Sequence, residues 1–263
     1  RPSAGRVAPG SHREDGGTAP PRPQGSAALG DPVGGGDQRL GLADRGDVDQ
    51  AAVEADGTPA LAARLLAPFT EGCFAHDDLL RLARRAYASF DHAAVAPLRH
   101  LDGDAWLLEL FHGPTLAFKD FAMQLLAAMF DEVLERRGER LTIVGATSGD
   151  TGAAAVHAFR GKRQIRIAML HPEGRVSPVQ RRQMTTVLDE NVLNAALGGD
   201  FDDCQDLVKA MFADEAFRHE LHLSAVNSIN WARIMAQIVY YFTAAASLGA
   251  PERRASFTVP TGN

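Results

Sequence analysis

The sequence has few cysteines, no long apolar run and no excess of positive charge. Only Cys73 and Cys204 occur among 263 residues, at no spacing typical of a disulfide or a metal site, which favours a reduced, cytoplasmic setting without a metal. The longest mostly apolar run, 238–250, is shorter than a membrane span, and no apolar stretch near the start resembles a secretory signal. A net charge of −6 argues against a nucleic-acid surface. We therefore expect neither a membrane nor a nucleic acid as partner.

Residues 1–57 differ in composition from the rest of the chain. They are rich in Gly, Pro, Ala, Asp and Arg and hold almost no aromatic or β-branched residues. Such a segment buries too little apolar surface to offset its ordering entropy, so we predict that it is disordered or aberrant. The chain starts without Met and stops directly after an apolar run, so we expect both ends to be artificial. Residues 58–263 are predicted to form the globular region.

The globular region alternates between helical and extended patterns. Apolar residues from Lys119 to Leu134 fall on one broad helical face, and Gly138 is a natural stop for that helix. The other predicted helices are 60–67, 77–90, 152–159, 177–185, 202–212 and 229–248. The predicted strands are 106–111, 141–146, 165–170, 192–197, 221–226 and 256–259. This alternation predicts an α/β fold with βαβ units and a buried parallel sheet.

Three loops are expected where ligands bind in open α/β sheets, at the carboxyl ends of strands. They are 113–120, 146–152 and 260–263. The second loop gathers hydroxyls and glycines at a helix start, where backbone N–H groups and the helix dipole attract a carboxylate or phosphate. A plain strand-to-helix turn with an N-cap uses the same residue types, so composition leaves both interpretations open.

Lys119 stands among apolar residues at the start of a predicted helix. Burial and the helix dipole both disfavour its charged form, so we predict a lowered pKa and a free amine. A free amine forms imines with carbonyl compounds. The alternative is a solvated lysine on the polar side of the helix, which is the commoner case.

Four motifs in order resemble those of the threonine synthase family, in its bacterial and fungal branch. They are Phe111-His-Gly-Pro-Thr-Leu-Ala-Phe-Lys-Asp, Gly145-Ala-Thr-Ser-Gly-Asp-Thr-Gly-Ala, Val226-Asn-Ser-Ile-Asn-Trp-Ala-Arg and Val259-Pro-Thr-Gly-Asn. The resemblance runs from about residue 60 to the end. It implies the tryptophan-synthase-β-like fold of pyridoxal-phosphate enzymes, and the conversion of O-phosphohomoserine and water to threonine and phosphate.

The resemblance also implies roles for individual residues. Lys119 would hold pyridoxal 5′-phosphate as an internal aldimine and then move protons on the substrate and cofactor. Apart from the resemblance, Arg233 is a candidate to meet the substrate phosphate because a guanidinium suits phosphate geometry, and a structural salt bridge is at least as favoured. His112 would touch cofactor or substrate, or serve as a turn residue with a satisfied ring. The residues expected to clamp the substrate carboxylate are Thr147, Ser148, Gly149, Asp150 and Thr151. Those expected to begin the cup for the cofactor phosphate are Thr261, Gly262 and Asn263.

The sequence departs from the family pattern in places. Many relatives in the wider fold type carry Asn at the position of Asp150, and the family pattern continues beyond Asn263. We therefore expect an incomplete catalytic region that binds the cofactor weakly and makes no threonine by itself. Two other functions stay open: a serine or threonine dehydratase of the same fold type, and a non-catalytic α/β domain without cofactor. The sequence leaves the oligomeric state open.

Overall fold

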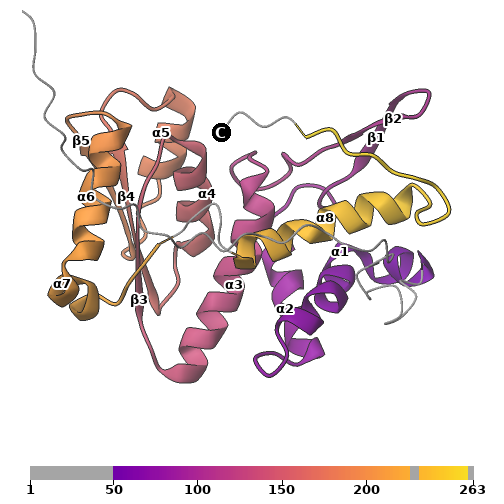
Figure 1. Ribbon diagram of the computed structural model, residues 1–263, viewed down its shortest axis with the longest axis horizontal. Coiled ribbons are helices and arrows are strands. Elements are labelled where there is room, and N and C mark those ends of the chain that lie inside the picture. Colours follow the sequence, from indigo (N-terminus) through magenta and orange to yellow (C-terminus); the bar gives the residue numbers. More distant parts are fainter. Residues whose placement is uncertain (1–49, 226–230, 260–263) are drawn as a thin grey trace, which may run out of the picture. The chain divides into compact units, whose positions relative to one another are not determined.

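The computed structural model describes residues 50–225 and 231–259, and all of them belong to one compact unit (Figure 1). The helices are α1 (Gln50–Leu66), α2 (His76–Tyr87), α3 (Lys119–Arg137), α4 (Asp150–Phe159), α5 (Pro178–Thr185), α6 (Phe201–Ala213), α7 (Glu215–Glu220) and α8 (Trp231–Ser247), with a 3₁₀ turn η1 (Ala67–Phe69). The strands are β1 (Leu98–Asp102), β2 (Ala105–Leu108), β3 (Leu141–Ala146), β4 (Ile165–Pro172), β5 (Val192–Leu197) and β6 (Leu223–Ser224). No helix in this part of the chain has the length and apolar character needed to cross a membrane.

Four strands form a parallel sheet in the order β5-β4-β3-β6, which confirms the predicted fold class. The register pairs Ile143 of β3 with Ile167 of β4, and Ile167 with Val192 of β5. Helix α6 lies on one side of β3 and β4, and α3 and α4 lie on the other (Figure 1). Because helices cover both faces, the central strands β3 and β4 are mainly apolar, and Ile143, Ile165 and Ile167 are fully buried.

Helix α3 is buried between two apolar cores rather than along the single face that the sequence predicts. Its residues Phe121, Ala122, Leu125, Ala128 and Met129 join a core with α1, α2 and α8. Its residues Met123, Leu126, Ala127 and Leu134 join a second core with α4 and the sheet. Each fully buried Leu or Phe contributes roughly 1.5–3 kcal/mol, so α3 is anchored from both sides. The backbone of Lys119, the first residue of this helix, is therefore held in place by the packing of α3.

The predicted end of α3 agrees with the structure, whereas α1 begins earlier than predicted. Helix α3 stops at Gly138, which has the left-handed φ of 64°, as predicted. Helix α1 starts at Gln50 and bends at Gly57, so it extends into the segment predicted to be disordered. Three alanines in 50–56 favour helix there and outweigh the polar composition. Residues 1–49 of that prediction lie outside the described residues.

The prediction of a last strand at 256–259 was wrong. These residues have no strand partner in the described part of the chain, and Phe257 stacks edge-on against Tyr241 of α8 at 5.0 Å. The predicted strand at 106–111 is shorter and belongs to an antiparallel hairpin, in which Leu98 pairs with Leu108. The sequence analysis missed the hairpin's first strand, β1. The predicted strand at 221–226 shortens to Leu223–Ser224, and residue 226 lies outside the described residues.

Candidate functional site

Lys119 and Asp150 meet above the carboxyl end of β3. Lys119 begins α3, its side chain is almost completely buried, and its Nζ donates a hydrogen bond to the Asp150 carboxylate. Asp150 begins α4, four residues after β3 ends at Ala146. The Lys119 Nζ also lies 5.0 Å from the ring centroid of Phe118. The prediction that Lys119 is covered is therefore confirmed, and the solvated alternative is excluded.

The charge of Asp150 depends on Lys119. Burial by itself would raise the pKa of the Asp150 carboxyl, but the hydrogen bond and positive charge of Lys119 outweigh it. The pKa of Asp150 therefore lies below its usual value, and the carboxylate is ionised at neutral pH. The site thus holds a buried lysine paired with an ionised carboxylate.

The loop at 147–151 carries three hydroxyl groups, of which one is hydrogen-bonded within the loop and two are not. Thr147 is buried, and its Oγ1 accepts hydrogen bonds from the backbone N–H groups of Gly149 at 3.0 Å and Gly152 at 2.8 Å. Thr147 therefore holds the loop together and has little capacity for a ligand. The Ser148 side chain is exposed, and neither its hydroxyl nor that of Thr151 makes a hydrogen bond within residues 57–225 and 231–259. Ser148 and Thr151 are the hydroxyls available to a substrate.

Gly149 allows the loop to make its turn. Its φ of +145° lies in a region that side chains rarely adopt, and a Cβ there would fall 2.1 Å from Oε1 of Gln180. Any larger residue would therefore be strained and would force the Gln180 side chain to move. The sequence predicted Gly149 as part of the clamp, and its role here is to shape the loop.

Arg233 brings a buried positive charge to the same site. It lies on α8, is 1% exposed, and its Nε and Nη1 have no hydrogen-bond partner in the described part of the chain. Burial lowers the pKa of its guanidinium, and the negative charge of Asp150 opposes that shift. Arginine stays protonated even so. A buried guanidinium nitrogen without a hydrogen-bond acceptor is costly, and Nε and Nη1 find no acceptor within the described residues.

The remaining predicted residues fall elsewhere. Thr261, Gly262 and Asn263 lie outside the described residues. His112 is a turn residue with a satisfied ring, since its Nδ1 bonds Asp91 at 2.8 Å and its Nε2 bonds Glu109 at 2.9 Å. The sequence analysis missed Asp120, which is fully buried behind the loop that precedes Lys119.

The two carboxylates around His112 give this region a pH dependence. The hydrogen bond to Glu109, and after it the one to Asp91, raises the pKa of His112 above its usual 6.5. Because the folded-state pKa is the higher one, this stabilisation is complete below about pH 6.5 and disappears as the pH rises through the raised value. We expect the free energy of unfolding to fall between about pH 5.5 and pH 8.5, and His112→Gln to remove part of that fall. Denaturant titrations of both proteins check this, and an identical pH dependence would contradict it.

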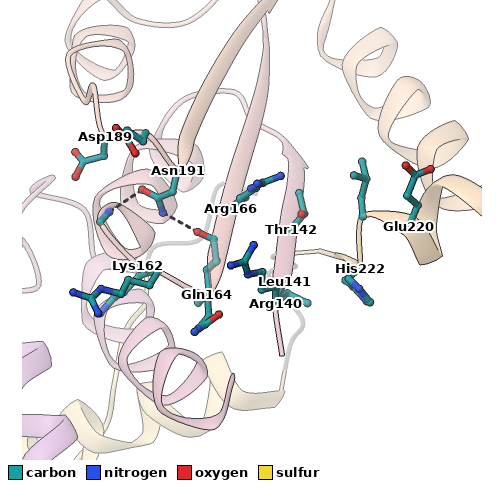
Figure 2. Close-up of a pocket in the computed structure, with 15 residues that line it drawn as sticks. Arg140, Leu141, Thr142, Lys162, Gln164, Arg166, Asp189, Asn191, Glu220 and His222 are labelled. Atoms are coloured by element: carbon teal, nitrogen blue, oxygen red, sulfur yellow. Dashed lines mark hydrogen bonds between the residues drawn. The ribbon is translucent and has the colours of Figure 1, made fainter. Parts of the chain in front are cut away.

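A groove of 610 Å³ lies at the opposite, amino edge of the parallel sheet (Figure 2). Its lining includes Arg140, Thr142, Gln164, Arg166, Asn191 and His222. Asn191 spans its floor and donates a hydrogen bond to the carbonyl of Ile165 at 2.8 Å. None of the predicted site residues lines this groove, and its arginines share it with Asp189, Glu190 and Glu220. The groove is therefore separate from the site of Lys119.

Comparisons with known proteins show the family of this chain. Residues 91–263 match the family described as pyridoxal-phosphate dependent enzyme. Threonine synthase of Pseudomonas aeruginosa is 59% identical over 203 residues, which cover 77% of this chain and 43% of that protein. Threonine synthase of Saccharomyces cerevisiae is 48% identical over 200 residues, which cover 71% of this chain and 39% of that protein.

Solved structures show the same relationship. The crystal structure of pyridoxal-phosphate-bound threonine synthase from Brucella melitensis has a TM-score of 0.78 and 59% identity, and the match covers 81% of this chain and 46% of that one. The chain spans less than half the length of these relatives. The fold is an α/β fold with a parallel sheet, and the candidate site pairs a buried lysine with an aspartate at the carboxyl edge of that sheet. The chain belongs to the family of pyridoxal-phosphate dependent enzymes.

The residues present fit the cofactor that this family implies. Pyridoxal 5′-phosphate joins an aldehyde to a dianionic phosphate, so it needs an amine for the aldehyde and donors for anionic groups. Lys119 offers the amine at the carboxyl edge of the sheet, where α/β proteins bind ligands. Two nitrogens of Arg233, Nε and Nη1, have no partner among the described residues and are of the kind that an anionic group needs.

Proposed function

We propose that this chain carries the cofactor lysine and part of the substrate site of a threonine synthase. The reaction converts O-phosphohomoserine and water to threonine and phosphate, with pyridoxal 5′-phosphate bound at Lys119. Both cysteines are free thiols, which supports a reducing, cytoplasmic setting. Because each relative is more than twice as long as the matched segment, the proposal concerns the residues present here.

The observation that carries the proposal is the grouping of Lys119, Asp150 and Arg233. They come from the starts of α3 and α4 and from α8, and two of the three are almost completely buried. The amine serves a carbonyl group, and the unpaired guanidinium serves an anion. A substrate that carries a phosphate suits this pair, since a guanidinium matches phosphate geometry. An unphosphorylated hydroxyamino acid, the substrate of a dehydratase, offers a carboxylate but no second anionic group.

Each residue has a distinct task in this proposal. The cofactor, when bound, supplies the electron sink that stabilises negative charge on the substrate. Lys119 binds the cofactor aldehyde and, once released, takes protons from substrate carbon and returns them. Asp150 keeps the Lys119 amine directed into the site and compensates its charge. Arg233 holds the substrate phosphate and then the phosphate that leaves.

The test is a titration of this chain with pyridoxal 5′-phosphate. We expect a near-visible absorbance band, and we expect borohydride reduction to fix the label on Lys119 in a peptide map. The reaction type is tested in a chimera in which this chain replaces the matching segment of the Pseudomonas aeruginosa enzyme. Release of phosphate and threonine from O-phosphohomoserine supports the proposal. Release of ammonia and a keto acid instead would identify a dehydratase.

Ser148 and Thr151 should affect substrate more than cofactor. We expect Ser148→Ala and Thr151→Val to raise the Michaelis constant of the chimera by about tenfold, the effect of one hydrogen bond to a charged group. Cofactor affinity should stay within about twofold, because these hydroxyls belong to the substrate clamp. Thr186→Val is the matched control, since Thr186 is exposed just after α5 and its hydroxyl donates a hydrogen bond to the Arg182 carbonyl at 2.7 Å. A loss of cofactor affinity with an unchanged Michaelis constant would mean that the loop binds the cofactor and not the substrate.

A further inference from the structure

The Asp120 carboxylate is fully buried and holds the loop that precedes Lys119. Its Oδ2 accepts a hydrogen bond from the backbone N–H of Thr115 at 2.7 Å, and its Oδ1 accepts one from the Thr115 hydroxyl at 2.7 Å. Both carboxylate oxygens are thus committed to one residue. Hydrogen bonds to an ionised acceptor are among the strongest in proteins, so this contact is a clamp on the loop.

Other contacts complete the clamp. The carbonyl of Thr115 accepts a hydrogen bond from Nε2 of Gln183 on α5 at 3.0 Å, so all three polar groups of Thr115 are bonded. Gly113 lies so close to Asp120 that a Cβ there would fall 2.4 Å from the Asp120 Cβ. Leu116 adopts a φ of 61°, which costs energy for a residue with a side chain. The loop is therefore held in a conformation that it would not take by itself.

These hydrogen bonds act on the loop and not on the helix. A capping side chain precedes its helix and accepts from the first helical N–H groups, and α3 has no such bond at Phe118. Asp120 lies one residue inside α3 and reaches backwards over Lys119 to Thr115. Lys119, the first residue of α3, thus lies in the chain between Thr115 and the Asp120 that holds it. Its side-chain direction depends on both.

We propose that Asp120 is a positioning residue for Lys119: by clamping Thr115 it directs the Lys119 amine into the site, where the cofactor aldehyde arrives. The inference rests on the proposed function, in which Lys119 is the attachment point. Loss of the clamp lets the loop relax from its strained conformation, and the amine then loses one of the contacts that fix its direction. Attachment of a carbonyl group becomes slower, while the two apolar cores around α3 keep the fold.

The test measures how fast pyridoxal 5′-phosphate attaches to Lys119, by the growth of the near-visible band and by borohydride labelling. Asp120→Ala removes both hydrogen bonds and should slow attachment by about tenfold or more. Thr115→Val removes the hydroxyl bond alone and should slow it about threefold to tenfold. Asp120→Asn should restore a rate within about twofold of wild type, because its amide can accept from the Thr115 N–H and donate to the Thr115 hydroxyl.

Thr70→Val is the matched control for lost stability. The Thr70 hydroxyl is also buried and bonds the Leu66 carbonyl at 3.0 Å, in a turn that does not touch the Lys119 loop. It should lower the melting temperature about as much as Thr115→Val and leave the attachment rate unchanged. If Thr115→Val attached cofactor at the Thr70→Val rate, Asp120 would have only a structural role. If wild type were labelled at another lysine, the proposed function would fail and this inference with it.

Discussion

Lys119→Ala should abolish cofactor attachment and lower threonine formation by about a thousandfold or more. In the proposed function the Lys119 amine is the nucleophile, and in the structure it is buried beside a carboxylate that compensates its charge. Alanine can neither bind the aldehyde nor move a proton on the substrate. The near-visible band should disappear from this chain, and phosphate release should disappear from the chimera with the Pseudomonas aeruginosa enzyme.

Two control variants separate chemistry from charge and folding. Lys119→Arg keeps a positive charge beside Asp150 but forms no stable imine, so it should be as inactive as Lys119→Ala while Asp150 stays paired. Lys162→Ala removes another poorly exposed lysine, which pairs with Asp131 at 3.2 Å, and should leave attachment unchanged. Attachment at a wild-type rate in Lys119→Ala would place the cofactor lysine elsewhere in the chain.

Local patterns predicted the sheet well because its strands are short apolar segments between polar loops. Two strands, 141–146 and 192–197, have the predicted bounds. The strand predictions failed where contacts with a distant segment of the chain decide the local structure. Residues 256–259 alternate like a strand, but Phe257 packs on Tyr241 of a helix instead. The pairing of β1 with β2 depends on a turn between weakly apolar strands, which left little signal.

The site was predictable only in its local parts. The motif and its apolar neighbours indicated Lys119. The contact of Lys119 with Asp150 joins residues 31 positions apart, and Asp150 was predicted only as part of the substrate clamp. Asp120 resembled an ordinary acid in the first turn of a helix, a position that the helix dipole favours. Its burial against Thr115 depends on the packing of α3 between two cores, which no short sequence pattern encodes.

Arg233→Met should weaken the binding of a phosphorylated substrate by about 10- to 100-fold without lowering the stability of the fold. Methionine has a similar length and is apolar, so it suits the buried position. Two nitrogens of Arg233 have no partner within the described residues, so few protein hydrogen bonds are lost. This decrease in affinity corresponds to the loss of one or two hydrogen bonds between charged groups. The measurement is the affinity of the cofactor-loaded chain for O-phosphohomoserine and for inorganic phosphate.

The melting temperature decides between the two roles open to Arg233. A buried arginine in a structural ion pair is strongly destabilising to remove, because its partner is left as an unpaired charge. If Arg233 instead binds a ligand anion, it is an unpaired buried charge in the ligand-free protein. Arg233→Met should then leave the melting temperature unchanged or raise it. Arg136→Met is the control, since Arg136 bonds Asp78 at 2.7 Å and Glu132 at 2.9 Å on the surface. That control should leave anion affinity unchanged. A large fall in melting temperature for Arg233→Met, with anion affinity unchanged, would assign Arg233 to the structure and leave the substrate phosphate without its proposed partner.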